Sequence, residues 1–252
     1  MRKLPGHIKV ALFVFLGITC LKVNGQIYSF SEFSVRSGLP NMQVNDITQD
    51  SLGYLWIATQ GGISRFNGQT FVNYTEKDGL VSNKCRSLFF DKKQRLWIGT
   101  ENGVSVFADE RFHNLTQENG LSATAVLSIT SIYDKIVLAT NNGGIKLVKF
   151  VADSFSVSSI NQDDGLISNF IFDVLVDKYN RLWAAELTGI NVVDFIDSTY
   201  TIDNLHNYTV LPNDYFIDLE MDKKGVIWVS TRESGVFKIS NHKDLPFLNI
   251  SN

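Results

Sequence analysis

GLPNMQVNDITQDSLGYLWIATQGGISRFNGQTFVNYT, residues 38–75, is one complete copy of a pattern that recurs along the 252-residue chain. The copy opens with Gly-Leu, and a second marker, Leu-Trp-Ile-Ala-Thr, comes after it. The first marker, which is Val-Leu in the last copy, recurs at intervals of 41, 41, 45 and 45 residues, beginning at Gly38, Gly79, Gly120, Gly165 and Val210. The second marker keeps its phase and carries Trp56, Trp97, Trp183 and Trp228, with Val137 in the third copy. Two markers in constant phase with a period of about 40–50 residues indicate a radial or stacked array.

Each copy contains the signals of four short strands. An alternating strand such as Val44-Asn45-Asp46-Ile47 comes first, and a tight turn leads to the apolar strand with the second marker. A glycine turn then leads to a third strand, and a fourth strand opens with Phe, Val or Ile. Four short antiparallel strands per repeat are typical of one propeller blade. We therefore predict that residues 26–252 are all-β and form a β-propeller of about five four-stranded blades, either closed or incomplete; a β-helix is the weaker alternative.

The turn after the first strand opens with Asp in four of the five copies. Asp at its first position can accept a hydrogen bond from the backbone two residues on, and Gly or Asn at its fourth position tolerates a positive φ angle. Gln94 occupies the fourth position in the second copy, which predicts a strained turn or a turn of another type. We interpret the recurrent Trp as a wedge between neighbouring blades rather than as a platform for a ligand.

The first 25 residues differ from the rest of the chain. Basic residues precede an apolar run over residues 10–21, and Val23-Asn24-Gly25 offers small residues before Gln26. This layout predicts a secretory signal peptide over residues 1–25, because the apolar run is too short to span a bilayer. An uncleaved membrane anchor and a lipoprotein attached at Cys20 are the alternatives. After cleavage Cys85 is the only cysteine, and its strand position predicts a buried, unreactive thiol.

The charge balance argues against a nucleic-acid partner. The full chain has a formal net charge of −3, from 23 basic and 26 acidic residues. Removal of residues 1–25 deletes four basic residues and no acidic ones, which makes the mature chain more acidic. No basic block offers a footprint for a phosphate backbone. We expect neither a nucleic-acid partner nor a membrane span after the signal peptide.

The composite motif of residues 38–75 resembles the two-component regulator propeller repeat. The resemblance extends over nearly all of the predicted mature chain, from about Phe30 to Ser251. It implies the periplasmic sensor part of a Bacteroidetes-type hybrid histidine kinase, which detects extracellular signals, often glycan fragments. The family's large sensors carry more repeats, followed by transducing and kinase domains, whereas this sequence has five repeats and no kinase motif. The resemblance therefore implies a periplasmic or secreted sensing module, intact or truncated, with an oligosaccharide or protein ligand and with either a signalling partner or a missing kinase portion.

The pattern of a fourth strand occurs twice at the ends of the array. Residues 27–33 stand in this phase ahead of the first repeat, and residues 247–251 complete the fifth repeat. Propellers often close by completing the last blade with an N-terminal strand, which protects the sheet edges. Both segments would compete for one position here. We expect five blades and, if the ring closes, one of these two strands displaced.

Catalytic constellations are missing from the sequence. His113, His206 and His242 stand at unrelated phases of the repeat, which argues against a shared metal or acid–base site. We expect no enzyme activity, no metal and no cofactor. A secreted interaction scaffold is one alternative function, and a propeller lyase or glycosidase with histidines and acids gathered at the axis is another.

Candidate ligand-binding residues come directly after the second marker of each repeat. Propeller ligands generally meet loops at one end of the central channel, and these positions are polar in four copies and differ between copies. The candidates are Gln60, Glu101, Asn141, Arg232 and Glu233. Acidic residues also recur in the first strand, at Asp46, Asp173 and Asp218. We interpret these as part of the repeat's own geometry. The alternative is that they form a ring of ligand-binding residues around the axis.

Overall fold

The computed structural model describes residues 30–123, 125–197, 199–208, 211–240 and 249–251. It divides into two compact units, Met1–Glu32 and Phe33–Asn252. The predicted signal peptide and Cys20 lie outside the described residues. All described strands belong to the second unit.

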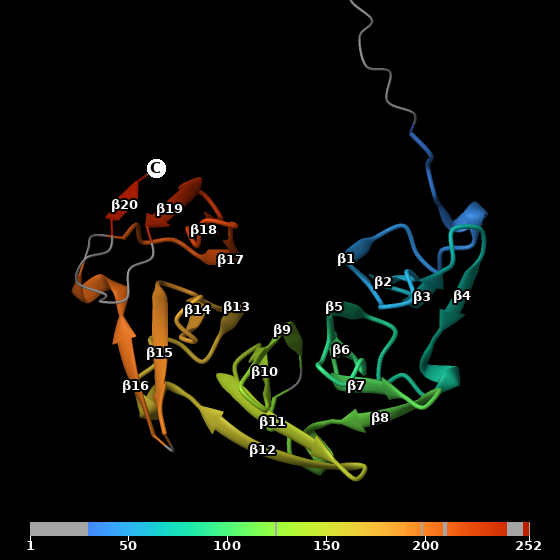
Figure 1. The fold of residues 1–252 in the computed structure, drawn as a ribbon, viewed down its shortest axis with the longest axis horizontal. Coiled ribbons are helices and arrows are strands. Elements are labelled where there is room, and N and C mark those ends of the chain that lie inside the picture. The colour runs from blue at the N-terminus through green and yellow to red at the C-terminus, as the bar shows by residue number, and fades with distance from the viewer. Residues whose placement is uncertain (1–29, 124, 198, 209–210, 241–248, 252) are drawn as a thin grey trace, which may run out of the picture. The chain divides into compact units, whose positions relative to one another are not determined.

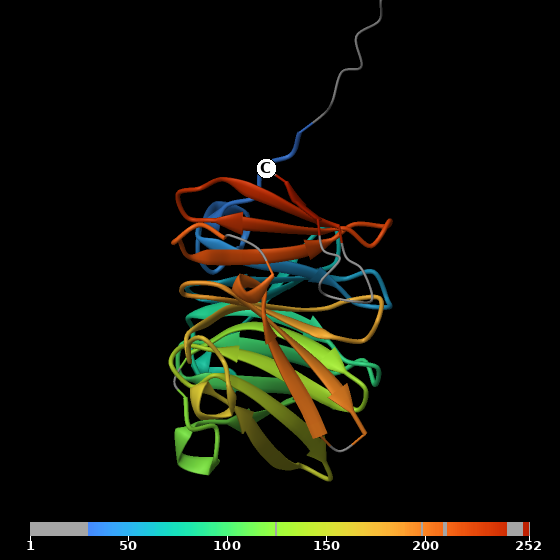
Figure 2. The ribbon, with the colours of Figure 1, turned by 90° about the vertical axis from the view of Figure 1, so that its left-hand side faces the viewer.

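The strands form five antiparallel sheets of four strands each, which confirms the predicted propeller fold. Each sheet keeps its strands in chain order, so one repeat makes one blade. The blades are β1 (Val44–Gln49), β2 (Leu55–Thr59), β3 (Gly62–Phe66) and β4 (Phe71–Tyr74); β5 (Cys85–Phe90), β6 (Leu96–Thr100), β7 (Gly103–Ala108) and β8 (Arg111–Leu115); β9 (Val126–Ile132), β10 (Lys135–Thr140), β11 (Ile145–Val151) and β12 (Ser154–Ile160); β13 (Ile171–Val176), β14 (Leu182–Glu186), β15 (Ile190–Ile196) and β16 (Thr199–Asn204); β17 (Phe216–Met221), β18 (Ile227–Thr231), β19 (Val236–Ser240) and β20 (Asn249–Ser251). The first strand of each blade lies nearest the axis and the fourth lies at the rim (Figure 1). Seen from the side, the strands of neighbouring blades stack as successive layers (Figure 2).

The Gly-Leu marker ends a short 3-10 turn that leads from one blade to the next. In η2 (Glu76–Asp78), Thr75 and Asp78 cap each other, and the Thr75 N–H donates to Asp78 Oδ2 at 2.8 Å. Gly79 then takes a φ of 104°, which a side chain would strain, and Leu80 is buried. The equivalent turns are η1 (Val35–Ser37), η3 (Gln117–Asn119), η4 (Gln162–Asp164) and η5 (Leu205–Asn207).

The first hairpin of a blade is held by its Asp and its Trp together. Asp91 accepts the N–H of Lys93 at 2.8 Å, as the turn chemistry predicts, and its other oxygen accepts the Trp97 Nε1–H at 3.0 Å. Gln94 has a φ of 61°, which confirms a strained turn. The same Trp-to-Asp hydrogen bond occurs in every Trp-bearing blade, from Trp56 to Asp50, Trp183 to Asp177 and Trp228 to Asp222.

Trp56, Trp97 and Trp183 lie between neighbouring blades, whereas Trp228 lies on a face of the last blade that is partly exposed. Trp183 and Ile190 of blade 4 share one cluster with Phe216 and Leu219 of blade 5. Trp97 of blade 2 packs in the same way against blade 3. At the boundary between blades 3 and 4, Val137 takes the place of the Trp and packs with Ile171 and Val174. Burying apolar area at these boundaries stabilises the array by roughly 25 cal/mol per Å².

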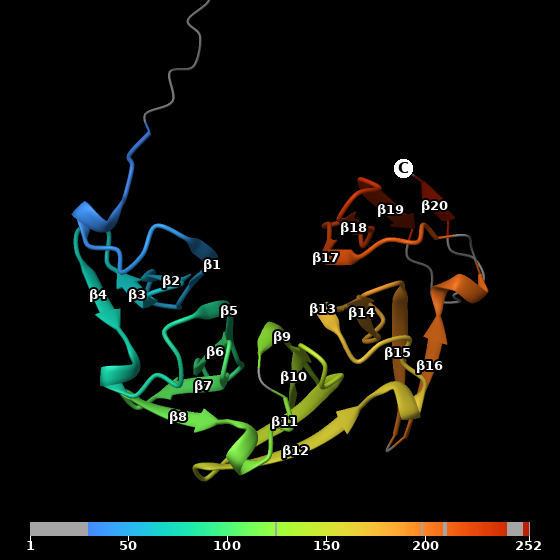
Figure 3. The ribbon, with the colours of Figure 1, turned by 180° about the vertical axis from the view of Figure 1, so that it is seen from behind.

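Blades 1 and 5 lie at the two ends of an open arc (Figures 1 and 3). The burial pattern agrees, since Ile47 of blade 1 is 56% exposed while its equivalent Leu88 in blade 2 is 8% exposed. At the other end Trp228 is 41% exposed, whereas Trp183 is fully buried. Blade 1 therefore exposes the face by which each later blade packs on the preceding one. Blade 5 exposes the opposite face, which carries the Trp.

The two predicted terminal strands have different outcomes. β20 pairs with β19, which confirms the fourth strand of repeat five for residues 249–251; residues 247–248 lie outside the described residues. The strand expected over residues 27–33 is not formed in residues 30–33, and residues 27–29 lie outside the described part. β20 already pairs with β19, so the fourth-strand position of blade 5 is taken.

Candidate ligand-binding site

The first strands of all five blades line a cavity of about 310 Å³ on the axis of the arc. Radial packing places these strands innermost, so two or three residues from each blade line the same space. The lining residues are Asn45, Asp46, Arg86, Ser87, Leu88, Leu127, Ser128, Ile129, Phe172, Asp173, Ile217 and Asp218. The cavity is mostly polar, which suits a hydroxyl-rich or charged ligand better than an apolar one.

The recurrent aspartates of the first strand connect neighbouring blades. Asp46 accepts the N–H of Ile47 at 2.7 Å and, across the boundary, the N–H of Leu88 at 2.6 Å. Asp173 makes the equivalent contact to the N–H of Leu219 at 2.7 Å. Burial raises the pKa of Asp46 above its usual range and the pKa of Asp173 to about 6, against the lowering effect of these hydrogen bonds. The contacts agree with the interpretation of these aspartates as part of the repeat's geometry.

Four of the candidate loop residues are placed by one shared backbone contact. The N–H of each donates to the carbonyl of the residue immediately before the first strand of its own blade. These contacts join Gln60 to Gln43 at 3.2 Å, Glu101 to Lys84 at 3.1 Å, Asn141 to Ala125 at 3.0 Å and Arg232 to Tyr215 at 3.0 Å. The candidates therefore lie at the same end of their blades.

The structure does not gather these side chains into one cluster, since the contacts they make are within their own blades. The Arg232 guanidinium lies 5.2 Å from the centre of the Tyr215 ring. Glu101 forms an ion pair with Arg86, and Arg86 lines the axial cavity. Glu101 thus links the loop end of the arc to the axial cavity.

Asp214, which the sequence reasoning missed, holds the loop that carries Glu233. Its Oδ2 accepts the N–H groups of Glu233 at 2.9 Å and Ser234 at 2.7 Å. Desolvation opposes ionisation, but these backbone donors and that of Tyr215 prevail and hold the pKa of Asp214 below its usual range. The available signal was the Pro-Asn-Asp sequence before the fifth repeat's first strand, because Asp readily caps such loops.

Glu186, also missed, is a fully buried carboxyl group at a position where the other four blades have Thr. Its oxygens accept hydrogen bonds from the Ser168 N–H at 2.6 Å and from Asn191 Nδ2 at 2.8 Å. Burial raises the pKa of Glu186 to about 8, although these donors work against that rise. The carboxyl is therefore mostly uncharged at neutral pH, and the departure from Thr was the signal that could have revealed it.

The remaining candidate reactive groups do not converge. His113 Nδ1 lies 3.6 Å from Asp153 Oδ1, and His206 Nε2 lies 2.8 Å from the Thr188 carbonyl in another part of the arc; His242 lies outside the described residues. Burial raises the pKa of the Cys85 thiol to about 12, which fits the predicted unreactive cysteine. Within the described ranges, no three His, Cys, Asp or Glu side chains form a group that could hold a metal ion.

No helix in the described part of the chain has the length and apolar character needed to cross a membrane.

Three segments of the chain, residues 38–61, 79–102 and 210–233, match the family model described as "Two component regulator propeller". They begin at the starts of the first, second and fifth repeats, so three of the five repeats match this family model. The protein named "Histidine kinase P4" from Formosa agariphila is 41% identical over 69 residues. That match covers 27% of this chain and 5% of the kinase, so the similarity concerns a small part of the relative.

Solved structures with a similar fold include extracellular domains from B. thetaiotaomicron. One belongs to a putative hybrid two component system and superposes with a TM-score of 0.68 at 22% identity, over 85% of this chain and 30% of that chain. A second gives 0.69 at 20% identity, over 91% and 32%. Virginiamycin B lyase from Staphylococcus aureus gives 0.65 at 14% identity, over 91% and 74%. The chain thus spans about a third of the length of the two extracellular domains, and the likenesses establish the propeller fold.

Proposed function

We propose that this chain, a carrier of two-component regulator propeller repeats, is the extracytoplasmic ligand-sensing propeller of a hybrid two-component regulator. The observation that carries the proposal is the match of three repeats to that family model. The fold likeness to extracellular domains of such systems supports it. In this role the propeller binds the signal and a histidine kinase, in the same or another chain, produces the response. The predicted signal peptide is consistent with this location.

We propose a glycan fragment as the signal, bound at the end of the arc that carries the candidate loops. Gln60, Glu101 and Asn141 offer amide and carboxylate groups that suit sugar hydroxyls, and Arg232 and Glu233 add one charge of each sign. The polar axial cavity joins this end through the ion pair of Glu101 with Arg86. Different side chains in each blade would favour an asymmetric ligand over a symmetric one.

A thermal-shift screen of the purified mature chain against neutral and acidic oligosaccharides tests this function. A ligand that binds only the native state stabilises it by about 2.7 kcal/mol at 100 times its Kd. For a chain of this size that corresponds to a Tm increase of roughly 5–10 °C. The double variant Gln60→Ala/Asn141→Ala should reduce the shift if the loops form the site. Failure of every oligosaccharide to raise the Tm would contradict glycan sensing.

A further inference from the structure

Blade 3 departs from the repeat in its first hairpin. Ile132 pairs directly with Lys135, so Tyr133 and Asp134 alone form the turn, and the Asp and Trp of the other blades are both missing. Tyr133 adopts a φ of 53°, which is uncommon for a bulky residue, and its ring is more than half exposed. A backbone held in this region often marks a place where function rather than stability selected the residue.

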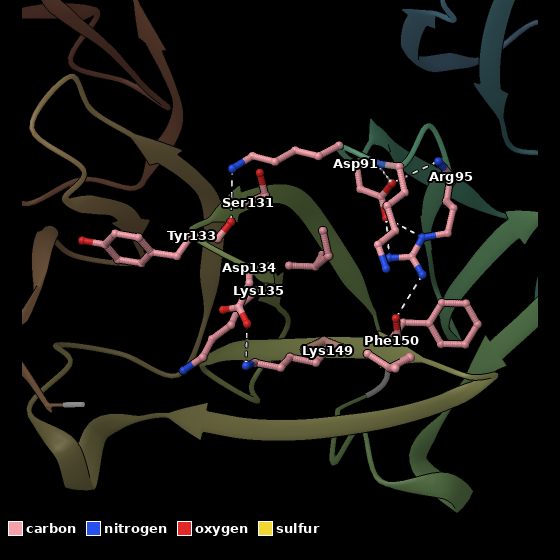
Figure 4. Close-up of a pocket in the computed structure, with 13 residues that line it drawn as sticks. Asp91, Arg95, Ser131, Tyr133, Asp134, Lys135, Lys149 and Phe150 are labelled. Carbon is pink, nitrogen blue, oxygen red and sulfur yellow. Dashed lines mark hydrogen bonds and ion pairs between the residues drawn. The ribbon is translucent and has the colours of Figure 1, made fainter. Parts of the chain in front are cut away.

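A cavity of about 330 Å³ lies beside this hairpin, between the turn of blade 2 and strands β10 and β11 of blade 3 (Figure 4). Its volume falls at the lower end of the range for ligand pockets, roughly 300–1,000 Å³. Ile136, Val148 and Phe150 provide an apolar floor. In Figure 4 Arg95 is held on Asp91, and Lys149 reaches Asp134 beside Tyr133.

The apolar lining of this cavity differs from that of the equivalent cavity between blades 1 and 2. At the equivalent place in blade 2, Leu96 pairs with two aromatic residues, Phe90 and Phe107. In blade 3, Ile136 occupies the position of Leu96 and pairs with Ser131 and Val148. Two phenyl rings are thus replaced by a hydroxymethyl and an isopropyl group, which removes apolar volume from the boundary.

The charges around the cavity are strongly unequal. Five basic side chains line it against two acidic ones. Arg95 pairs with Asp91 at 2.6 Å, and Lys149 pairs with Asp134 at 2.6 Å. The other three basic residues, Lys92, Lys93 and Lys135, make no ion pair within the described residues. Lys92 Nζ instead donates to the Tyr133 carbonyl at 3.3 Å, which places its charge beside another residue of the cavity lining.

The positive charge is not a general property of the repeat or of the chain. The corresponding cavity between blades 1 and 2 is lined by one basic residue, Arg65, and three acidic ones, Asp50, Asp109 and Glu110. The chain as a whole carries a net charge of −3. A local surplus of three positive charges in an acidic protein attracts anions and repels cations.

We propose that this cavity is a binding site for the acidic group, a carboxylate or a sulfate ester, of a charged oligosaccharide. Lys92, Lys93 and Lys135 supply point charges for the anion. The apolar floor and the exposed ring of Tyr133 accommodate the less polar face of a sugar. The proposal rests on the proposed glycan-sensing function and adds to it the chemical class of the signal and a second contact region, away from the predicted loops.

The test compares binding of three probes of matched length by calorimetry: a galacturonate oligosaccharide, a sulfated galactan oligosaccharide and a neutral galactan oligosaccharide. Lys92→Gln/Lys93→Gln removes two charges from the cavity, and Lys223→Gln/Lys224→Gln removes two charges from the equivalent turn of blade 5. The first variant should bind at least one acidic probe about tenfold or more weakly, which is about 1.4 kcal/mol. The second should bind it as the wild type does. Raising the salt concentration from about 0.05 M to about 0.5 M should weaken acidic binding and leave neutral binding unchanged.

The outcomes separate this proposal from the proposed function. If a neutral or acidic probe binds and Lys92→Gln/Lys93→Gln has no effect, glycan sensing stands and the cavity assignment is wrong. If the two double variants weaken acidic binding equally, net charge rather than this cavity is responsible, and the assignment is again overturned. If no probe binds the wild type, both proposals fail. Equal far-UV circular dichroism and Tm for the variants and the wild type establish that the cavity variant is folded.

Discussion

Replacing Trp228 and Trp183 by alanine, one at a time, tests whether the arc is open in solution. Both residues hold the same position of the repeat, and both donate a hydrogen bond to the Asp of their own turn. They differ in their surroundings. Trp183 is covered by blade 5, whereas Trp228 lies on the face of blade 5 that points away from blade 4. The pair is therefore a matched comparison of one side chain with and without a neighbouring blade.

The exposed fractions set the expected difference. Truncating a fully buried Trp to Ala costs about 3–5 kcal/mol. Trp228 is 41% exposed. A Trp side chain buries up to about 250 Å², so roughly 100 Å² of Trp228 remains in water. At about 25 cal/mol per Å² this lowers the cost by about 2.5 kcal/mol. Trp228→Ala should therefore cost about 0.5–2.5 kcal/mol and Trp183→Ala about 3–5 kcal/mol.

Urea unfolding followed by far-UV circular dichroism measures both costs, with the chain's monomeric state checked by sedimentation velocity. The midpoint should shift much less for Trp228→Ala than for Trp183→Ala, with similar m-values. Equal costs would refute the open arc, because Trp228 would then be covered in solution. A cost for Trp228→Ala that grows with protein concentration would attribute the cover to a second copy, and a cost independent of concentration would attribute it to ring closure.

Three single-residue changes test other parts of the structure. Because the folded-state pKa of Glu186, about 8, exceeds its usual value of 4.5, its contribution to stability is fully present below pH 4.5 and is lost as the pH rises through 8. Relative to Glu186→Gln, the wild type should lose on the order of 3 kcal/mol between pH 5 and pH 8 in urea titrations, and parallel profiles would contradict the buried neutral carboxyl. Gln94→Gly should stabilise the chain by about 1 kcal/mol, because it relieves a positive φ. The control Asn180→Gly should change the stability little, because Asn tolerates that region of φ. Equal shifts of the urea unfolding midpoint for the two variants would argue against strain at Gln94. Asp46→Ala should cost about 1–3 kcal/mol, since it leaves the Leu88 N–H without its acceptor, and a smaller loss is expected for Asp218→Ala in the last blade; the reverse order of midpoints would rule out the inter-blade contact.

The repeat pattern was sufficient to predict the strands, their order and the structural role of the Trp position. Each of these depends on residues close together in the chain, such as the turn from Asp91 to Gln94 or the alternation in the first strand. The hydrogen bond from Trp97 to Asp91 was also within reach, because the two residues keep a constant spacing in four copies. Local geometry repeats with the sequence, so local predictions transfer from one copy to the next.

The candidate site was predicted only in part. Gln60, Glu101, Asn141 and Arg232 do share one loop position at one end of the blades, but no periodic argument could show that Glu101 pairs with a residue of the axial cavity. The cavity beside Tyr133 was not foreseen. It requires side chains from two blades and arises where the third copy breaks the repeat, so its signal lies in the departures from the pattern.

The sequence by itself determined five four-stranded blades, the turn that joins each pair of strands and the residues that face a neighbouring blade, because these depend on a period of two within strands and a constant phase between repeats. Only the tertiary structure decided whether a neighbouring blade is present at each of those faces. Trp183 and Trp228 have the same local sequence context, yet one is buried and the other is partly in water. Burial, and with it the raised pKa of Glu186 and the surplus charge around Lys92, depends on distant segments meeting in space. The sequence marks such places only as departures from the repeat and does not say which segments meet there.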